Sequence, residues 1–116
     1  MILVDTSVWV DHFRRGSPRL RELLEEGTVC MHPMVLGELA CGNLPDRIRT
    51  IALLDSLPHA PQVKDEMVMG AIERRRLWAQ GIGWVDAHLL CSALVSGSQL
   101  WTFDRRLARL ATLEGE

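Results

Sequence analysis

The chain has 116 residues, of which 47% are hydrophobic and 24% are charged, and its formal net charge is −2 at pH 7. This length suits one folded domain, and the hydrophobic content excludes an intrinsically disordered chain. The longest nearly apolar run, 89–95, is too short to cross a bilayer, and no basic stretch with a cleavage site follows Met1. We therefore expect one domain over residues 1–116, located in the cytoplasm, with no membrane partner.

The chain contains three cysteines, Cys30, Cys41 and Cys91, and no Cys-x-x-Cys pair. The odd count and the spacing argue against a disulfide framework and against a structural zinc site. We expect the three side chains to be small buried hydrophobic groups in a reducing compartment.

Four short apolar segments are expected to form strands, at 2–4, 28–31, 57–60 and 100–102. None of them alternates cleanly between polar and apolar residues, which is typical of parallel strands buried on both faces.

Helical patterns fill the intervals between these strands. We expect helices over 8–15, 34–41, 64–80, 85–95 and 105–113, one from Pro18 to a stop at Gly27, and one capped by Asp46. The helix over 64–80 would be the longest and would end at Gly81-Ile82-Gly83. Strands that alternate with helices predict an α/β fold with a parallel sheet, in which ligands lie beyond the carboxyl ends of the strands.

Four acidic residues are candidates for a site at that edge. Asp5 directly follows the first predicted strand, and Asp104 follows the last one after a single residue. Asp86 opens the apolar helix over 85–95, and Glu38 lies on the helix over 34–41 among apolar or small neighbours. Each has a simpler explanation, because aspartate is a favoured helix N-cap and glutamate is common on solvated helix faces. Taken together, carboxylates converging from separate elements favour Mg²⁺, which takes oxygen ligands and activates water in nucleases.

Four segments around these acids resemble the motifs of one known family. The stretch LVDTSVW at 3–9 resembles the opening of PIN domains, and especially of VapC-type toxins. HPMVLGEL at 32–39, GWVDAHLL at 83–90 and LWTFDRRL at 100–107 resemble the later acidic motifs of that family, in the same order. The resemblance implies a three-layer α/β fold with a short parallel sheet flanked by helices. It also implies hydrolysis of RNA phosphodiester bonds that depends on Mg²⁺ or Mn²⁺.

The resemblance assigns catalytic and metal-binding roles to the four acids. We expect Asp5 and Asp86 to be the principal metal ligands, with Glu38 and Asp104 orienting the attacking water. The products would carry 5′-phosphate and 3′-hydroxyl ends.

The resemblance also implies auxiliary roles for three hydroxyl side chains. Ser7 or Thr6 would hold Asp5 and the water shell of the metal, and Thr102 would lie near Asp104 at the rim of the site. Phe103 departs from the family pattern, because many relatives have a basic or polar residue there. If that position touches RNA, binding is either more apolar or taken over by its neighbours Arg105 and Arg106.

Arginine accounts for 12 of the 13 basic residues, and its planar guanidinium binds phosphate bidentately. Codon usage explains this bias equally well. Arg105 and Arg106 are the RNA-binding candidates nearest to an acid. The arginines at 14, 15, 19, 21, 74–76 and 109 are further candidates, although a solvated helix face is the simpler explanation for 74–76.

Several other residues near the motifs are assigned to structure. We expect His32 and His88 to be structural, since the oxygen ligands suffice for Mg²⁺. We expect packing roles for Trp9, Trp84 and Trp101, and core or dimer contacts for Met67, Met69 and Ile72.

Three other functions are alternatives to a toxin nuclease. A PIN nuclease with a housekeeping role in RNA processing would have the same catalytic residues, and a neighbouring antitoxin gene would separate the two. A phosphoacceptor receiver domain needs an aspartate after a mid-chain strand and a lysine after a late strand, and this chain has neither. A PIN fold without activity finds no support, since all four acids are present.

A toxin also implies partners. The family precedent is an antitoxin whose carboxyl-terminal segment wraps the toxin, with an arginine plugging the acidic site. An exposed apolar groove on the helical face would receive the rest of that segment. Homodimerisation is common in the family and is expected here.

Overall fold

The computed structural model describes the backbone of residues 1–115 and the side chains through residue 112. Its sheet has three parallel strands in the order β2-β1-β3, with β1 (Ile2–Val4) in the centre, β2 (Val29–Cys30) on one side and β3 (Gln99–Trp101) on the other. The helices are α1 (Thr6–Arg15), α2 (Pro18–Glu25), α3 (Pro33–Ala40), α4 (Arg47–Asp55), α5 (Asp65–Arg74), α6 (Trp84–Ser96) and α7 (Arg105–Gly115).

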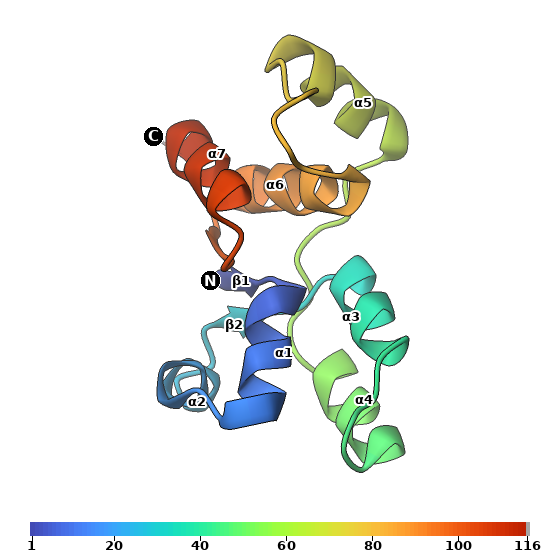
Figure 1. The fold of residues 1–116 in the computed structure, drawn as a ribbon, viewed down its shortest axis with the longest axis vertical. Helices are drawn as coiled ribbons and strands as arrows, with labels where there is room; N and C mark the ends of the chain where they lie inside the picture. The colour runs from blue at the N-terminus through green and yellow to red at the C-terminus, as the bar shows by residue number, and fades with distance from the viewer. Residues whose placement is uncertain (116) are drawn as a thin grey trace.

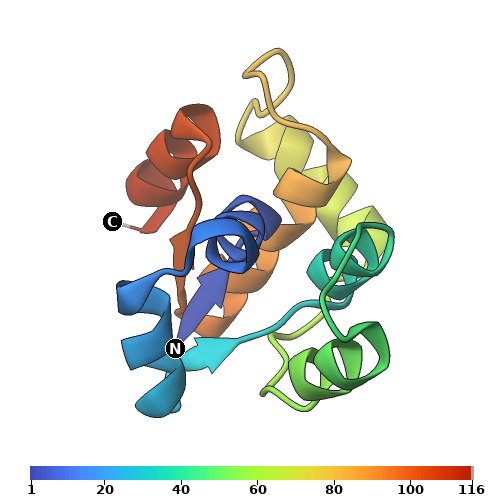
Figure 2. The ribbon, with the colours of Figure 1, turned by 60° about the horizontal axis from the view of Figure 1, so that its bottom comes forward.

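The sheet is buried between helices (Figures 1 and 2). Leu3 and Val4 of β1 are fully buried and share one apolar cluster with side chains of α1 and α6, among them Val8 and Leu89. The predicted α/β class with a short parallel sheet flanked by helices is therefore confirmed. None of the described helices is long and apolar enough to cross a membrane.

Strand register places the ends of β1 and β3 side by side. Leu3 lies opposite Leu100, Val4 lies opposite Trp101, and the Asp5 N–H donates to the Trp101 carbonyl at 2.9 Å. The chain segments that follow both strands therefore leave the sheet at the same edge, where ligand sites of parallel sheets lie.

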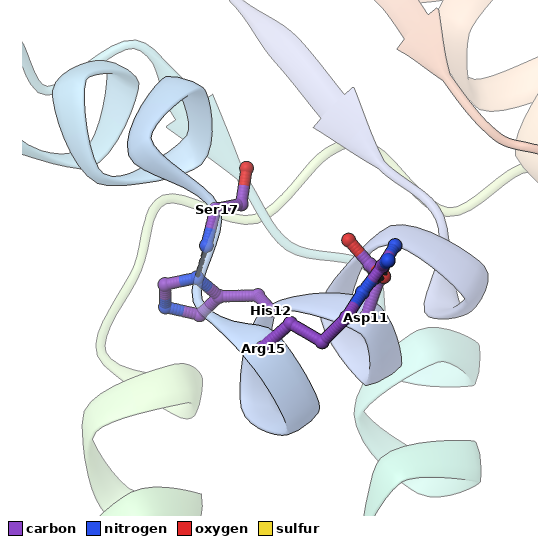
Figure 3. A network of polar contacts seen from close by, with 4 residues as sticks. All are labelled: Asp11, His12, Arg15 and Ser17. Atoms are coloured by element: carbon purple, nitrogen blue, oxygen red, sulfur yellow. Dashed lines mark hydrogen bonds and ion pairs between the residues drawn. The ribbon is translucent and has the colours of Figure 1, made fainter.

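The corner between α1 and α2 is fixed by side chains close in sequence (Figure 3). The Ser17 N–H donates to Nδ1 of His12 at 3.0 Å, and Ser17 Oγ in turn accepts from the Leu20 N–H at 3.1 Å as the N-cap of α2. Arg15 pairs with Asp11 one turn earlier. Burial and the charge of Arg21 lower the pKa of His12, so its ring is neutral and can accept this bond at neutral pH.

His32 links α3 to α6 from within the core. Its ring is fully buried; Nδ1 accepts from the Met34 N–H at 3.1 Å, and Nε2 lies 3.1 Å from Ser92 Oγ. Because Nδ1 accepts, the proton of the neutral ring is on Nε2, which donates to Ser92. Both nitrogens are thus engaged, which supports the structural role expected for this histidine.

The predicted strand at 57–60 is wrong. Only a single bridge joins Met31 to His59, through bonds from the Met31 N–H to Pro58 O and from the Ala60 N–H to Met31 O, each 2.7 Å. Pro58 and Pro61 lack an N–H, so the ladder cannot continue in either direction.

The predicted long helix over 64–80 is also wrong, because α5 ends at Arg74. Arg76 adopts a left-handed conformation with φ 53°, and the Leu77 N–H bonds to Ile72 O at 2.9 Å, which is the closing bond of a Schellman-type helix end. The turn buries Leu77 against Leu90 and Leu107. Burial of Leu77 therefore prevails over the helical propensity of 75–80.

Some smaller expectations also fail. Asp46 precedes α4 but has φ 42° and makes no capping bond with its side chain. Cys30 and Cys91 are buried, whereas Cys41 is exposed. Met67 and Met69 are 58% and 52% exposed, which rules out core packing and leaves a dimer contact as a prediction. Other boundaries shift by one or two residues.

We predict that His32 makes the protein less stable in mild acid. Burial is the main cause that lowers the pKa of His32 from 6.5 to about 4, and the charges of His88 and His59 add to it. The unfolded chain takes up this proton below pH 6.5, whereas the folded chain does not until about pH 4. The stabilisation present above pH 6.5 is therefore lost as the pH falls to about 4, by up to about 3 kcal/mol. Urea unfolding from pH 7 to pH 4 should show a steeper loss in wild type than in His32→Asn, and equal slopes would contradict the assignment.

Candidate active site

Asp5 lies at the carboxyl end of the central strand and is 7% exposed. Its Oδ2 accepts hydrogen bonds from Thr102 Oγ1 at 2.7 Å and from Ser7 Oγ at 2.9 Å. These two hydroxyls therefore satisfy one oxygen of a buried polar side chain. Of the two hydroxyl residues expected to hold Asp5, Ser7 makes this contact and Thr6 does not.

Thr102 joins the ends of β1 and β3. Its Oγ1 donates to Asp5 and accepts from the Asp104 N–H at 3.0 Å. Ser7 makes a parallel link, since its Oγ accepts from the Phe103 N–H at 3.1 Å. The backbone of 102–104 is therefore fixed relative to Asp5, as expected for a threonine at the rim of the site.

Asp104 is the N-cap of α7. Its Oδ1 accepts from the Arg106 N–H at 2.9 Å and the Leu107 N–H at 3.1 Å, so the capping explanation holds for this residue. It does not hold for Asp5, which precedes α1 but makes no capping bond with its side chain. Arg105 and Arg106 follow Asp104 directly, and both side chains are exposed.

Glu38 reaches this edge from α3. Its Oε1 accepts from Thr6 Oγ1 at 2.6 Å, a bond between residues 32 positions apart. The sequence did not indicate this partner, because the family resemblance places Thr6 only beside Asp5. Two adjacent hydroxyls, Thr6 and Ser7, thus hold two different acids.

Asp86 lies in the first turn of α6, where its Oδ2 accepts from the Gly83 N–H at 3.2 Å. Burial raises its pKa, the Gly83 bond opposes that shift, and the charges of Asp5, Asp104 and Glu38 raise it further. Each of the other three carboxylates is therefore close enough for its charge to act on Asp86. The structure thus brings together all four acids singled out from the sequence.

Each of the four carboxylates uses one oxygen for hydrogen bonds within the protein. Among the described residues, no donor reaches the second oxygen of any of them, and no arginine, lysine or histidine forms an ion pair with them. A group of four acids without a matching cation repels itself, and a bound cation would remove that repulsion.

The donor set fits a hard divalent cation. All four donors are carboxylate oxygens, the type that Mg²⁺ and Mn²⁺ prefer. In the part of the chain that the structure describes, no three such side chains stand close enough to enclose an ion alone. Mg²⁺ characteristically binds through one or two carboxylates and keeps several waters, so an open arrangement of acids suits it.

The histidines and aromatic residues near the acids have other surroundings. His88 is buried, with Nε2 3.2 Å from Asp65 Oδ1 and its ring packed edge-on against Trp84, so its contacts are with α5 and its own helix. Phe103 is 52% exposed at the rim and meets Trp101 edge-on. An apolar RNA contact at Phe103 stays a prediction.

Comparison with known proteins agrees with this geometry. The PIN domain family matches residues 2–113. The chain belongs to the PIN-domain family. Two curated relatives, both named Ribonuclease VapC32, from Mycobacterium tuberculosis strains CDC 1551 / Oshkosh and ATCC 25618 / H37Rv, are each 49% identical to this PIN domain over 108 residues. The match covers 92% of this chain and 87% of each relative.

We predict that the Thr102 hydroxyl is required for the stability of this edge. Thr102→Val keeps the volume but leaves the Asp104 N–H without its acceptor and Asp5 with one donor fewer. The free energy of unfolding should fall by about 1–3 kcal/mol in urea titrations. Thr102→Ser keeps the hydroxyl and should lose less. A Val variant as stable as wild type would show that the bond does not hold the edge together.

Proposed function

We propose that this PIN domain is a metal-dependent endoribonuclease and the toxin of a toxin–antitoxin pair. The observation that carries the proposal is the group of four carboxylates at one sheet edge, each with an oxygen that no donor among the described residues reaches. The two relatives named as VapC ribonucleases support the reaction and the toxin role.

Asp5 and Asp86 would be the principal residues that hold Mg²⁺ or Mn²⁺, directly or through water, with Glu38 and Asp104 completing the acidic pocket. Asp5 and Asp86 are the less exposed pair, so their free oxygens lie in the less hydrated part of the site. The bound cation supplies Lewis-acid activation of water and neutralises charge that develops on the phosphate.

The other residues orient the reacting groups. Thr102 and Ser7 fix one oxygen of Asp5, which leaves the other free to act in the site. Thr6 does the same for Glu38. Glu38 and Asp104 are exposed, so they can meet the RNA strand and orient the water that attacks phosphorus. The P–O3′ bond breaks, which leaves 5′-phosphate and 3′-hydroxyl ends.

An antitoxin segment would inactivate the enzyme by covering this edge. A groove of about 450 Å³ begins at Glu38 and runs between α1 and the loop after α3. Apolar side chains line it, among them Val10, Phe13 and Leu39. An apolar peptide that ends in an arginine would fill the groove and bring a cation to the acids. Homodimerisation stays a prediction.

We predict that Asp5→Asn abolishes RNA cleavage without unfolding the protein. Asparagine preserves the shape of the side chain but removes one negative charge, so cleavage of RNA by purified protein should fall by about 100-fold or more. Expression of wild type in a bacterium should arrest growth and degrade RNA, and expression of the variant should do neither. Excess EDTA should stop the wild-type reaction, and added Mg²⁺ or Mn²⁺ should restore it.

Asp46→Asn is the matched control, because Asp46 is exposed, makes no capping bond with its side chain and has a left-handed backbone that asparagine tolerates. This variant should cleave RNA at the wild-type rate. Cleavage by Asp5→Asn at the wild-type rate, or full activity in excess EDTA, would refute the proposal.

A further inference from the structure

A second hollow, of about 410 Å³, lies between the loop that precedes α6 and the side of α7 that carries Arg106 and Arg109. It is lined by Ala79, Gln80, Gly81, Arg106, Arg109 and Leu110. We propose that this hollow, the arginine pocket, binds a backbone phosphate of the RNA strand next to the one that is cleaved. This inference rests on the proposed function and adds a substrate-binding subsite to it.

The two arginines of the pocket have no charged partner in the part of the chain that the structure describes. Arg106 and Arg109 are three positions apart on α7, so they share one face of the helix. Among the described residues, no carboxylate forms an ion pair with either of them, whereas Arg15 is paired with Asp11 and Arg19 with Glu22. Two unneutralised guanidinium groups at one hollow favour an anion that both can contact, and phosphate matches their planar donors.

Gly81 allows Arg106 to lie against the opposite wall of the pocket. A Cβ atom built on Gly81 would stand 2.4 Å from Cδ of Arg106 and 2.7 Å from its Nη1. Gly81 also has φ 82°, a conformation that other residues rarely adopt. A larger residue here would displace the Arg106 side chain, so the position of that side chain depends on glycine at position 81.

Both segments that line the pocket also bond to acids of the site. On the α7 side, the Arg106 N–H itself donates to Asp104 Oδ1 at 2.9 Å. On the loop side, Gly83 lies two residues after Gly81, and its N–H donates to Asp86 at 3.2 Å. Leu107, fully buried against Leu77, packs α7 against the loop. The pocket is therefore held at a fixed place beside two of the four acids.

The position of the pocket would offset the electrostatic repulsion between the acidic site and RNA. The protein has a net charge of −2, and the four acids repel the RNA that must approach them. Phosphate contacts by arginine set the register of a nucleic acid strand and supply most of its electrostatic affinity. Arginines that flank the acids would hold the strand so that the neighbouring phosphodiester lies at the acidic edge.

The test is steady-state cleavage of a single-stranded RNA oligonucleotide by the double variant Arg106→Gln/Arg109→Gln over a range of salt concentrations. KM should rise about tenfold at low salt while kcat stays within about twofold of wild type. The slope of log KM against log salt should fall by about 0.7 for each phosphate that the variant no longer binds. Removing nucleotides from the end of the RNA that reaches the pocket should raise KM for wild type and abolish its difference from the variant.

Arg49→Gln is the matched control, since Arg49 is an exposed arginine on α4, which lies away from α7 (Figure 1). It should leave KM and the salt slope unchanged, and thermal unfolding should show that all variants fold.

If wild type cleaves RNA but the double variant has the KM and the salt slope of wild type, the proposed phosphate binding by the pocket is wrong, and the proposed function still stands. A loss confined to kcat would also overturn the proposed phosphate binding, because the arginines would then act on the site and not on binding. A wild type that neither binds nor cleaves RNA would contradict both the pocket and the proposed function.

Discussion

The hydrogen bond from Thr102 to Asp5 joins residues 97 positions apart and holds the whole functional edge together. It exists because β1 and β3 run parallel in register, so that the chain leaves both strands at the same end of the sheet. Ser7 duplicates the link by bonding to Asp5 and to the backbone of Phe103. Next to these linked strand ends, Thr6 in the first turn of α1 bonds to Glu38, and α7 begins after its N-cap Asp104. The core therefore specifies the geometry of the acids before any ligand binds.

The acidic edge is the part of the molecule where local charges are left unbalanced. Hydroxyl and backbone donors satisfy one oxygen of each carboxylate, but no cationic side chain in the described part of the chain forms an ion pair with any of them. The raised pKa of Asp86 reports burial together with the charges of the other three acids. Stability alone would favour an arginine or an amide here, and the proposed binding of a divalent cation from solution accounts for four carboxylates in its place. The proposed phosphate-binding role of Arg106 and Arg109, which form no ion pair with the described residues, is complementary to that of the acids.

Sequence patterns predicted which acids lie together where those acids follow the ends of strands. They failed where burial of a side chain prevailed over the local helical pattern. Asp5 and Asp104 could be placed together because each follows a recognisable strand, and Glu38 and Asp86 because their helices carry family motifs. The Thr6 contact with Glu38 could not be predicted, since it depends on how α1 packs against α3. The pattern over 64–80 is helical throughout, yet the chain turns at Arg76 to bury Leu77. The sequence singled out Arg106 and Arg109 as candidate RNA contacts, but the loop that forms the other wall of the arginine pocket follows that turn, so no local pattern predicted the pocket itself.

The most direct test of the central claim is a titration of the purified protein with Mn²⁺, followed by electron paramagnetic resonance of the free ion, with Mg²⁺ as competitor. The account predicts saturable binding by wild type and by Asp46→Asn, displacement by Mg²⁺, and a rise in the melting temperature when the ion is present. Asp5→Asn and Asp86→Asn should each bind at least about tenfold more weakly while remaining folded. A wild type that binds no Mn²⁺, or variants at Asp5 and Asp86 that bind it as tightly as wild type, would contradict the claim that these carboxylates together hold a divalent cation.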